Sequence, residues 1–498
     1  MKTKKQIPNF RRLTSAAVLA AILLPLASCS SEEIVEETSN VTEDTTTVLT
    51  STVETEARYL PEGVRYDGEK VHMFVRAGSS LPEFFVDEQK GEIVSDAIFD
   101  RNLKVQEDLG VTFSFREETS DWASRQQFAD TISASIMAGD QAFDVVAGYS
   151  KSISSYLAAN GMLGDMLSTK YLNFAQPWWS DSLIEQAKVN NKLYFATGDI
   201  STWALYCMFG VFYNRDMLKD YDLQNPADLV DNNQWTLDKM IEMSKGIYKD
   251  LNGNTTKDLD DQLGMAVPYP NIDSFYHASG LNTTELDEKG MPYVSDDLTS
   301  EKTVNLVELL CKIFHSDDTA YIVKDSETNS FVNGHVLFTI STLSYGRTLA
   351  NGDFAYGIVP VPKYDAEQKS YATILSNPHT LYGIPKDARD YDMTSAVLES
   401  LAAEGYKLVS PALFEINMKK RYSEDDQTSR MYDIIKGSVC FDFGRVFTDQ
   451  LGTLTYGPFR NKINSNTGDT WMSSWASSKP QLETMLADLL KTFQSFEE

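Results

Sequence analysis

The sequence predicts an α/β protein in which strands and helices alternate along the chain. Apolar residues recur at every second position in residues 71–75 and again in 111–115, which is the period of a strand. Between them, residues 94–109 place apolar side chains on one helical face and end at Gly110, a residue typical of a helix end. Strands that alternate with helices imply a mostly parallel sheet with helices on both faces.

The same rhythm continues toward the C-terminus. The apolar runs at 143–148, "FDVVAG", and at 204–214, "ALYCMFGVFYN", have the composition of strands. In 237–248 and 304–314 apolar side chains recur at helical spacing, and Thr236 can cap the first of these helices. We therefore expect the α/β pattern to cover most of the chain.

The length and the charge of the chain limit the number of its domains and the kinds of partner that it can bind. Its 498 residues are enough for two or three domains, and 42% hydrophobic with 23% charged residues is an ordinary composition for a soluble protein. The net charge is −28, although the first 28 residues hold five basic residues and no acid. Binding to nucleic acid needs clustered Lys and Arg, so we expect no nucleic-acid partner.

The N-terminus, residues 1–28, has the form of a bacterial signal peptide. A basic stretch is followed by an apolar run that is too short to span a membrane. Leu26, Ala27 and Ser28 then precede Cys29, an arrangement that resembles the lipobox of bacterial lipoproteins. In such proteins the cysteine is acylated, with palmitate for example, and two acyl chains are sufficient for stable anchoring. An ordinary secretory signal with a chance cysteine is the alternative.

Residues 29–66 are expected to form a disordered tether. From 30 to 57 the chain is rich in Ser, Thr and acidic residues, has no basic residue, and shows no period that would bury a face. We therefore expect an extracytoplasmic protein that is lipid-anchored to the outer face of the cell membrane.

Residues 249–264, "KDLNGNTTKDLDDQLG", resemble a calcium-binding loop. Oxygen-bearing residues fall at positions 1, 3, 5, 7, 9 and 12 of the EF-hand-type pattern, in which position 7 supplies a backbone carbonyl. These residues are Asp250, Asn252, Asn254, Thr256, Asp258 and Asp261. The loop departs from the usual pattern, because Gly253 stands at position 4 rather than 6 and an Asp replaces the final Glu. We expect one structural calcium ion here, and a solvated acidic turn is the alternative.

Signatures of catalysis are missing from the sequence. The chain has no GxSxG, HExxH, GxxxxGK[ST] or GxGxxG motif, and its five histidines are scattered. What stands out instead is a set of segments rich in aromatic and polar residues, namely "PWWSDSL", "STWALYCMFG", "PYPNIDSFYHASG" and "STLSYGR". Aromatic rings stack on the apolar faces of sugars while polar side chains bind the hydroxyls. The alternative is that these rings belong to the core.

Five stretches carry motifs that together point to a family. In order they are "IMAGDQAFDVVAGYSKSISSYLAANGMLGDM", "NNKLYFATGDISTWALYCMFGVFYNRDML", "WTLDKMIEMSKGIYK", "FVNGHVLFTISTLSYGR" and "FAYGIVPVPKYDAEQKSYAT". They resemble the extracellular solute-binding proteins of ABC importers, family 1, the maltose-binding type. The resemblance runs from about residue 70 to the C-terminus.

The resemblance implies a type II periplasmic-binding-protein fold, in which two α/β lobes are joined by crossing hinge strands. Lobe 1 would comprise 67–199 and 341–376, and lobe 2 would comprise 200–340 and 377–498. The chain would cross between lobes near 198–202, 337–340 and 374–381. The ligand would lie in the cleft at the carboxyl ends of the strands.

The resemblance also implies which residues line the cleft. The residues at the corresponding positions of this chain are Tyr149, Ser150, Trp203, Tyr206, Asp273, Phe275, Tyr276, Tyr345, Arg347, Phe443 and Arg445. Trp203 and Tyr276 are expected to face the ligand from the second lobe. Phe443 and Arg445 stand where the family often has a Trp, and this departure argues against a maltodextrin ligand.

The expected function is that of a monomeric binding protein without catalytic activity. It would capture a small polar solute, most simply a sugar or oligosaccharide, and deliver it to the membrane subunits of an ABC importer. Three alternatives stay open: a lipoprotein that presents its ligand to a sensor kinase, an oligopeptide binder, and a secreted glycosidase.

Overall fold

The computed structural model describes residues 59–77, 82–315, 318–324, 329–349, 353–414 and 426–496. The expected signal peptide, the acylation site at Cys29 and the tether up to residue 58 lie outside these ranges. None of the helices in the ranges above combines the length and the hydrophobicity that crossing a membrane would require.

The folded part of the chain begins earlier than expected. Tyr59 packs edge-on against Trp178, with ring centroids 6.3 Å apart. The Tyr66 amide donates a hydrogen bond to the Leu109 carbonyl at 2.7 Å. Because these residues are held by the body of the protein, the expected tether boundary at residue 66 is wrong.

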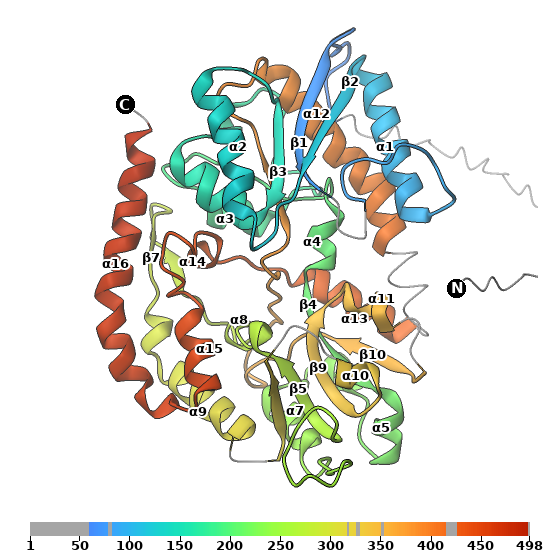
Figure 1. Cartoon of the computed structure of the whole chain (residues 1–498), viewed down its shortest axis with the longest axis vertical. Helices are drawn as coiled ribbons and strands as arrows, with labels where there is room; N and C mark the ends of the chain where they lie inside the picture. The colour runs from blue at the N-terminus through green and yellow to red at the C-terminus, as the bar shows by residue number, and fades with distance from the viewer. Residues whose placement is uncertain are drawn as a thin grey trace, which may run out of the picture. The chain divides into compact units, whose positions relative to one another are not determined.

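The first sheet has the strand order β11-β3-β1-β2. Its strands are β1 (Lys70–Arg76), β2 (Thr112–Glu118), β3 (Val145–Tyr149) and β11 (Thr380–Gly383). β1 pairs in parallel with β2 and β3, whereas β11 runs antiparallel to β3. Figure 1 shows α1, α2 and α12 around this sheet.

The second sheet has the order β10-β4-β9-β5-β8. Its strands are β4 (Phe209–Asn214), β5 (Leu263–Pro268), β8 (Ala320–Val323), β9 (Val336–Thr342) and β10 (Tyr356–Val359). β5 is parallel to β8 and β9, whereas β4 is antiparallel to β9 and β10. The predicted α/β class is therefore confirmed, but both sheets are mixed. The antiparallel strand is β11 at an edge of the first sheet and β4 inside the second sheet, between β10 and β9.

The remaining strands form a hairpin, β6 (Thr284–Leu286) and β7 (Pro292–Val294). The helices are α1 (Ile93–Leu109), α2 (Arg125–Ala138), α3 (Asp181–Ala187), α4 (Thr202–Tyr206), α5 (Arg215–Asp220), α6 (Pro226–Asp231), α7 (Leu237–Ser244), α8 (Ser274–Ala278), α9 (Glu301–His315), α10 (Asn329–Val332), α11 (Tyr345–Leu349), α12 (Tyr391–Glu404), α13 (Asp426–Gly437), α14 (Phe443–Val446), α15 (Gly457–Asn464) and α16 (Trp471–Ser495).

Local signals explain several helix ends. α1 stops at Gly110, whose φ of 68° is left-handed and costs a glycine little. α7 begins as expected after Thr236, whose hydroxyl accepts a hydrogen bond from the Lys239 amide at 3.3 Å. The expected strand at 204–214 is only half right. Its first part is the short helix α4, whose start is capped by the Ser201 hydroxyl, which accepts from the Trp203 amide at 3.2 Å.

Two segments join the sheets. One runs from Ala196, which pairs with Tyr382 in the first sheet, through α4 to β4 in the second. The other runs from β10 to β11 and pairs with the first through Met208 and Leu375. The crossings expected near 198–202 and 374–381 lie in these segments.

Two expected boundaries are wrong. Residues 337–340, expected to cross between lobes, lie inside β9, where they pair with β4 and β5 of the second sheet. β10, assigned to lobe 1, pairs with β4 in the second sheet, and β11, assigned to lobe 2, pairs with β3 in the first. A strand belongs to the sheet in which it is hydrogen-bonded. The sequence of a buried strand shows that it is a strand, but it does not show which strand it pairs with.

Candidate functional site

The carboxyl ends of β1, β3 and β5 carry the polar side chains of the candidate site. Ligands of open α/β sheets bind in the crevice outside these ends. β1 ends at Arg76, β3 is followed by Ser150 and Lys151, and β5 is followed by a turn that leads to Asp273. A C-terminal segment, 442–460, reaches the ends of β3 and β5 through the contacts described next.

The first contact is an ion pair between that segment and the first sheet. The Lys151 ammonium lies 2.7 Å from the Asp449 carboxylate, and the Arg125 guanidinium lies 3.1 Å from its other oxygen. Lys151 also donates to the Tyr456 hydroxyl at 3.3 Å. Burial is the main cause that lowers the pKa of Lys151, to about 8, and the nearby Arg445 and Arg125 lower it further.

The second contact is a buried triad that ties the segment to the second sheet. The Asp273 carboxylate pairs with Arg445 through one oxygen and with Arg460 through the other, the latter at 2.8 Å. Burial alone would raise the pKa of Asp273, but the two guanidinium groups outweigh it and lower the pKa to about 2. Asp273 and Arg445, both expected in the site, therefore lie together.

A small cavity of about 20 Å³ lies beside Arg445. His379 lines it, and its Nδ1 lies 2.9 Å from the Ser376 carbonyl. A carbonyl only accepts, so Nδ1 carries the proton and Nε2 is an acceptor. Within the described part of the chain, Nε2 has no hydrogen-bond partner. Burial lowers the pKa of His379 to about 4, which keeps the ring neutral at pH 7.

Aromatic rings flank these charges. The exposed ring of Trp122 lies under the Arg125 guanidinium at 4.0 Å and the Lys151 ammonium at 4.5 Å. On the crossing segment, half-buried Trp203 lies 5.9 Å from the Arg76 guanidinium. The Trp203 ring meets the buried ring of Tyr206 edge-on at 5.7 Å. The site thus combines cations with aromatic surfaces.

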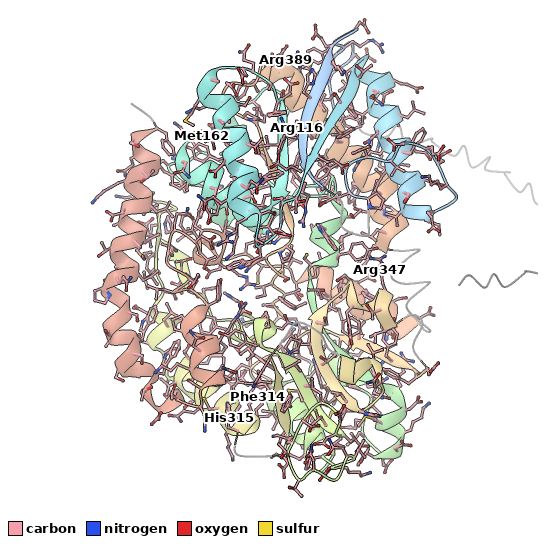
Figure 2. The ribbon with its side chains drawn as sticks, viewed as in Figure 1. Arg116, Met162, Phe314, His315, Arg347 and Arg389 are labelled. Atoms are coloured by element: carbon pink, nitrogen blue, oxygen red, sulfur yellow. The ribbon has the colours of Figure 1, made fainter. Side chains whose placement is uncertain are left out.

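The expected residues of α11 lie at the edge of this region. Arg347 lies 6.0 Å from the Tyr206 ring, and Figure 2 shows it beside the space between the sheets. Tyr345 is half-buried and meets Phe212 edge-on at 5.5 Å. From the first sheet, buried Tyr149 and Ser150 also belong to the expected set, and the Ser150 hydroxyl donates to the Asn377 carbonyl at 2.6 Å.

Three expected site residues lie in the core instead. Phe275, Tyr276 and Phe443 are at most 3% exposed. Tyr276 packs edge-on against Phe459 at 5.3 Å, and its hydroxyl donates to the Asn282 carbonyl at 3.2 Å. The cleft position expected for these rings is wrong in this structure. α8, which holds Phe275 and Tyr276, is buried along its whole length, and Phe443 in α14 packs against Phe447 with ring centroids 4.6 Å apart.

Sequence reasoning missed most of the charged residues. Lys151 comes two residues after β3, a strand that the sequence predicts, and this position could have marked Lys151 as a candidate site residue. Trp122, Arg125, Asp449 and Arg460 carry no signal in the sequence, because their role depends on distant segments coming together. Arg125 and Asp449 are 324 residues apart, and Arg460 and Asp273 are 187 residues apart.

A second pocket, of about 300 Å³, lies on the other side of the crossing segments. We call this second pocket the rear pocket. Val439 lines the rear pocket, and Ile374 and Cys440 line the small cavity. Leu375 and Phe441 line both. On the first crossing segment, Ala204, Leu205 and Met208 line the rear pocket, whereas Trp203 and Tyr206 lie near Arg76 and Arg347. This segment therefore stands between the rear pocket and the ligand side.

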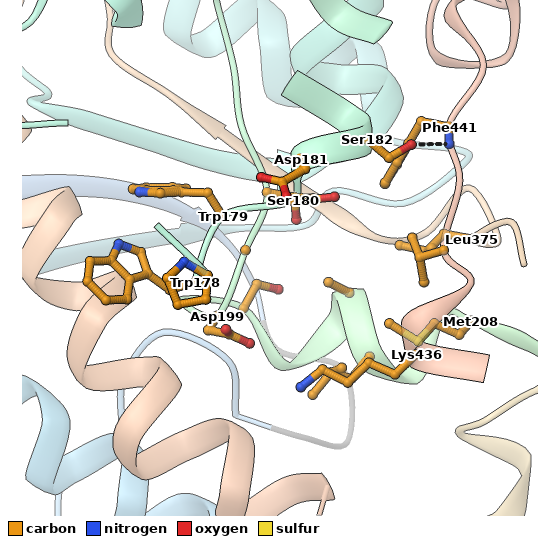
Figure 3. Close-up of a pocket in the computed structure, with 17 residues that line it drawn as sticks. Trp178, Trp179, Ser180, Asp181, Ser182, Asp199, Met208, Leu375, Lys436 and Phe441 are labelled. Atoms are coloured by element: carbon orange, nitrogen blue, oxygen red, sulfur yellow. Dashed lines mark hydrogen bonds between the residues drawn. The ribbon is translucent and has the colours of Figure 1, made fainter. Parts of the chain in front are cut away.

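Titratable groups surround the rear pocket. Figure 3 shows Trp178, Asp199 and Lys436 around it. Burial raises the pKa of Asp199 to about 6. Behind the pocket, burial raises the pKa of Glu399 to about 7, and its carboxylate accepts from the indole nitrogens of Trp178 and Trp179 at 3.1 and 3.0 Å. These two tryptophans, singled out by the sequence, thus have a structural partner.

The calcium-type loop follows α7 at the end of the second sheet. The amide nitrogens of Asn252 and Asn254 lie 3.2 and 2.7 Å from the Asp258 carboxylate. Asp250 accepts from backbone amides of the loop, and buried Asp261 does the same. In the described ranges, no three Asp, Glu, His or Cys side chains form a group suited to a metal. Rotating an amide side chain by half a turn exchanges its nitrogen and oxygen, so the loop can offer a set of oxygens.

Comparison with known proteins defines the class. Residues 106–402 match the model of a family described as bacterial extracellular solute-binding protein. This match spans more than half of the chain, and the chain belongs to that family. It is an extracellular solute-binding protein, which confirms the expected family. No curated protein matches the chain.

Two solved structures have the same fold. One is an ABC substrate-binding protein from Listeria monocytogenes in complex with cycloalternan, at 12% identity and a TM-score of 0.50, covering 86% of this chain and 100% of that one. The other is a cyclo/maltodextrin-binding protein complexed with maltotetraose, at 13% identity and a TM-score of 0.54, covering 86% and 96%. At these identities the likeness concerns the fold, and it confirms the expected two-lobed α/β architecture.

Proposed function

We propose that this protein captures a carbohydrate between its two sheets and delivers it to an ABC importer without chemically changing it. The observation that carries the proposal is the set of aromatic and charged side chains at the carboxyl ends of β1, β3 and β5. Rings such as Trp122 and Trp203 offer stacking surfaces for sugar faces. The carbohydrate ligands of the two solved structures support the same class of ligand.

Binding would be coupled to closure of the two sheets around the crossing segments. A ligand that contacts both sheets favours the closed form by its difference in affinity for the two forms. The closed form would present the surface that the importer's membrane subunits recognise.

A thermal-shift screen of the mature protein tests the proposal. A ligand that binds only the folded protein raises the melting temperature, by an amount that grows with its concentration over Kd. Oligosaccharides should raise it and oligopeptides of similar size should not. A shift with peptides alone would overturn the carbohydrate proposal in favour of an oligopeptide binder.

Trp203→Ala should weaken saccharide binding while leaving the melting temperature of the free protein nearly unchanged, because its ring is only half-buried. Tyr276→Ala is the contrasting variant. It should mainly destabilise the protein, because its ring is 3% exposed. Unchanged saccharide affinity in Trp203→Ala would contradict the placement of the ligand beside α4.

We also propose that Cys29 is acylated and holds the protein at the outer face of the cell membrane. The lipobox-like residues before Cys29 support this. Cys29→Ala should move the protein from the membrane fraction to the soluble fraction. Continued fractionation with membranes would reject the anchor.

The calcium loop is proposed as a structural site that stabilises the second sheet and its helices. Its support is the oxygen pattern of residues 250–261 and the convergence of Asn252, Asn254 and Asp258. Calorimetric titration with calcium should show one site in the wild type and none in an Asp250→Ala, Asp258→Ala double variant. No binding by the wild type at about 1 mM calcium, the weak end for such loops, would reject it.

A further inference from the structure

The candidate site carries an excess of positive charge, although the chain as a whole carries −28. One continuous cluster of ion pairs, a hydrogen bond and a cation–ring contact links both sheets. Asp449 joins Lys151 to Arg125, Tyr456 joins Lys151 to Arg460, and Asp273 joins Arg460 to Arg445. The cluster therefore holds four cations, Arg125, Lys151, Arg445 and Arg460, and two carboxylates, Asp273 and Asp449.

This excess is largely shielded from water. The side chains of Lys151, Arg445 and Arg460 are 2, 9 and 10% exposed, and Arg125 is 22% exposed. Removing a cation from water without a matching anion costs free energy. The chain has 72 acidic residues, yet only two carboxylates contact these four cations. A buried excess of positive charge is typical of a site that binds an anionic group.

Neighbouring charges offset this excess only in part. The Asp442 carboxylate lies next to the cavity and adds one negative charge, and it accepts from the backbone amides of Thr283 and Thr284 and from both of their hydroxyls rather than from a cation. Glu83 is paired with the Ser201 hydroxyl, and burial raises its pKa. Arg76 adds a further positive charge, which acts on both Glu83 and His379.

A buried donor in the cluster still lacks an acceptor. Among the described residues, the Nε of Arg460 has no hydrogen-bond partner, although the side chain is about nine-tenths buried. Next to it, the Arg460 guanidinium lies 4.3 Å from the Tyr456 ring centre. An unsatisfied buried donor beside these cations can bind a hydrogen-bond acceptor of a ligand, and an anionic acceptor would also offset the charge.

We infer that the solute bound by this protein is an anionic saccharide, whose carboxylate or sulfate groups are held by Arg125, Lys151, Arg445 and Arg460. Charge-assisted hydrogen bonds from guanidinium groups to such oxygens are stronger than neutral ones. Trp122 and Tyr456, which lie beside the same cations, provide surfaces for the sugar rings. This inference rests on the proposed carbohydrate function and adds the charge of the ligand to it.

The first test is a thermal-shift panel with the mature protein. It contains neutral oligosaccharides from starch, cellulose and xylan, carboxylated ones from pectin and alginate, and sulfated ones from carrageenan. Stabilisation should be confined to the carboxylated or the sulfated set, and the set that responds identifies the anionic group. Stabilisation by neutral saccharides alone would overturn the charge inference and leave the proposed function standing. No response to any saccharide would overturn both.

The second test is calorimetry with the stabilising oligosaccharide. Arg125→Gln should weaken binding about tenfold, because it removes one charge-assisted contact. Asp449 keeps Lys151 as its partner in this variant, so the fold should persist. Arg430→Gln is the matched control, because Arg430 pairs with Asp231 at the surface, away from the cluster. Equal losses in both variants, or no loss in Arg125→Gln, would overturn the inference.

Salt provides an independent readout. Raising the NaCl concentration from about 0.05 to about 0.5 M shortens the screening length severalfold and should weaken binding of the anionic ligand to the wild type. The weakening should be smaller in Arg125→Gln than in Arg430→Gln. Binding that does not respond to salt in any of the three proteins would contradict a charge-based site.

Discussion

At the scale of single residues, the site is dominated by buried charge. Asp273 holds two guanidinium groups at once, and Asp449 holds one ammonium and one guanidinium group. These pairs connect the C-terminal segment to both sheets. A buried ion pair contributes little net stability compared with apolar packing, but removing one partner leaves an uncompensated charge.

Asp273→Asn should therefore lower the free energy of unfolding by about 3 to 5 kcal/mol, because Arg445 and Arg460 would lose their shared partner. Urea unfolding followed by circular dichroism measures it. Asp231→Asn is the control, since its pair with Arg430 is solvent-exposed and should contribute less than about 1 kcal/mol. Equal effects of the two substitutions would show that the Asp273 triad is not the buried junction described here.

At the scale of elements, local sequence signals determine where some helices begin and end, whereas tertiary packing determines the secondary structure of other segments. α7 begins and is capped where its sequence indicates, and Gly110 ends α1 as expected. By contrast, residues 202–206 form α4 within an apolar run that has the composition of a strand. Capping depends on a residue and its nearest neighbours, whereas the choice between a short helix and a strand depends on which surface covers it.

Thr236→Ala should destabilise the protein by about 1 kcal/mol, because the Lys239 amide loses its side-chain acceptor. Thr236→Ser keeps a hydroxyl and should retain most of the stability. Thermal or urea unfolding of the three proteins makes the comparison. If Ser and Ala variants were equally unstable, packing of the Thr methyl group rather than capping would be the cause.

At the scale of the whole molecule, the crossing segments separate two hollows. Trp203 and Tyr206 face Arg76 and Arg347, whereas Ala204, Leu205 and Met208 of the same stretch line the rear pocket. Because the two hollows lie on opposite sides of the hinge, opening the ligand side should compress the rear pocket. Filling the rear pocket should then disfavour the open form.

Ala204→Trp should reduce the radius of gyration of the ligand-free protein in small-angle X-ray scattering and should bind ligand more tightly than the wild type. Ala134→Trp, on the exposed face of α2, is the control and should behave like the wild type. A larger radius or weaker binding in Ala204→Trp would mean that the rear pocket does not close as the ligand side opens.

The sequence by itself determined the class of fold and the family. Both rest on local information: the periods of apolar residues, the helix ends, and short motifs that stay together along the chain. It also located Asp273, Arg445 and Trp203, which belong to such motifs, although it placed Phe275, Tyr276 and Phe443 beside the ligand as well.

Only the tertiary structure decided which rings are core and which charges meet. Tyr276 and Trp203 both occur in aromatic segments, but α8 is covered on every side while α4 lies at the crossing. Lys151 and Asp449 are 298 residues apart in sequence and 2.7 Å apart in space. No local pattern encodes such a pair, because the pairing is fixed by how the sheets and the C-terminal segment pack together. The positive charge of the site, and with it the inferred charge of the ligand, therefore followed from the tertiary structure and not from the sequence.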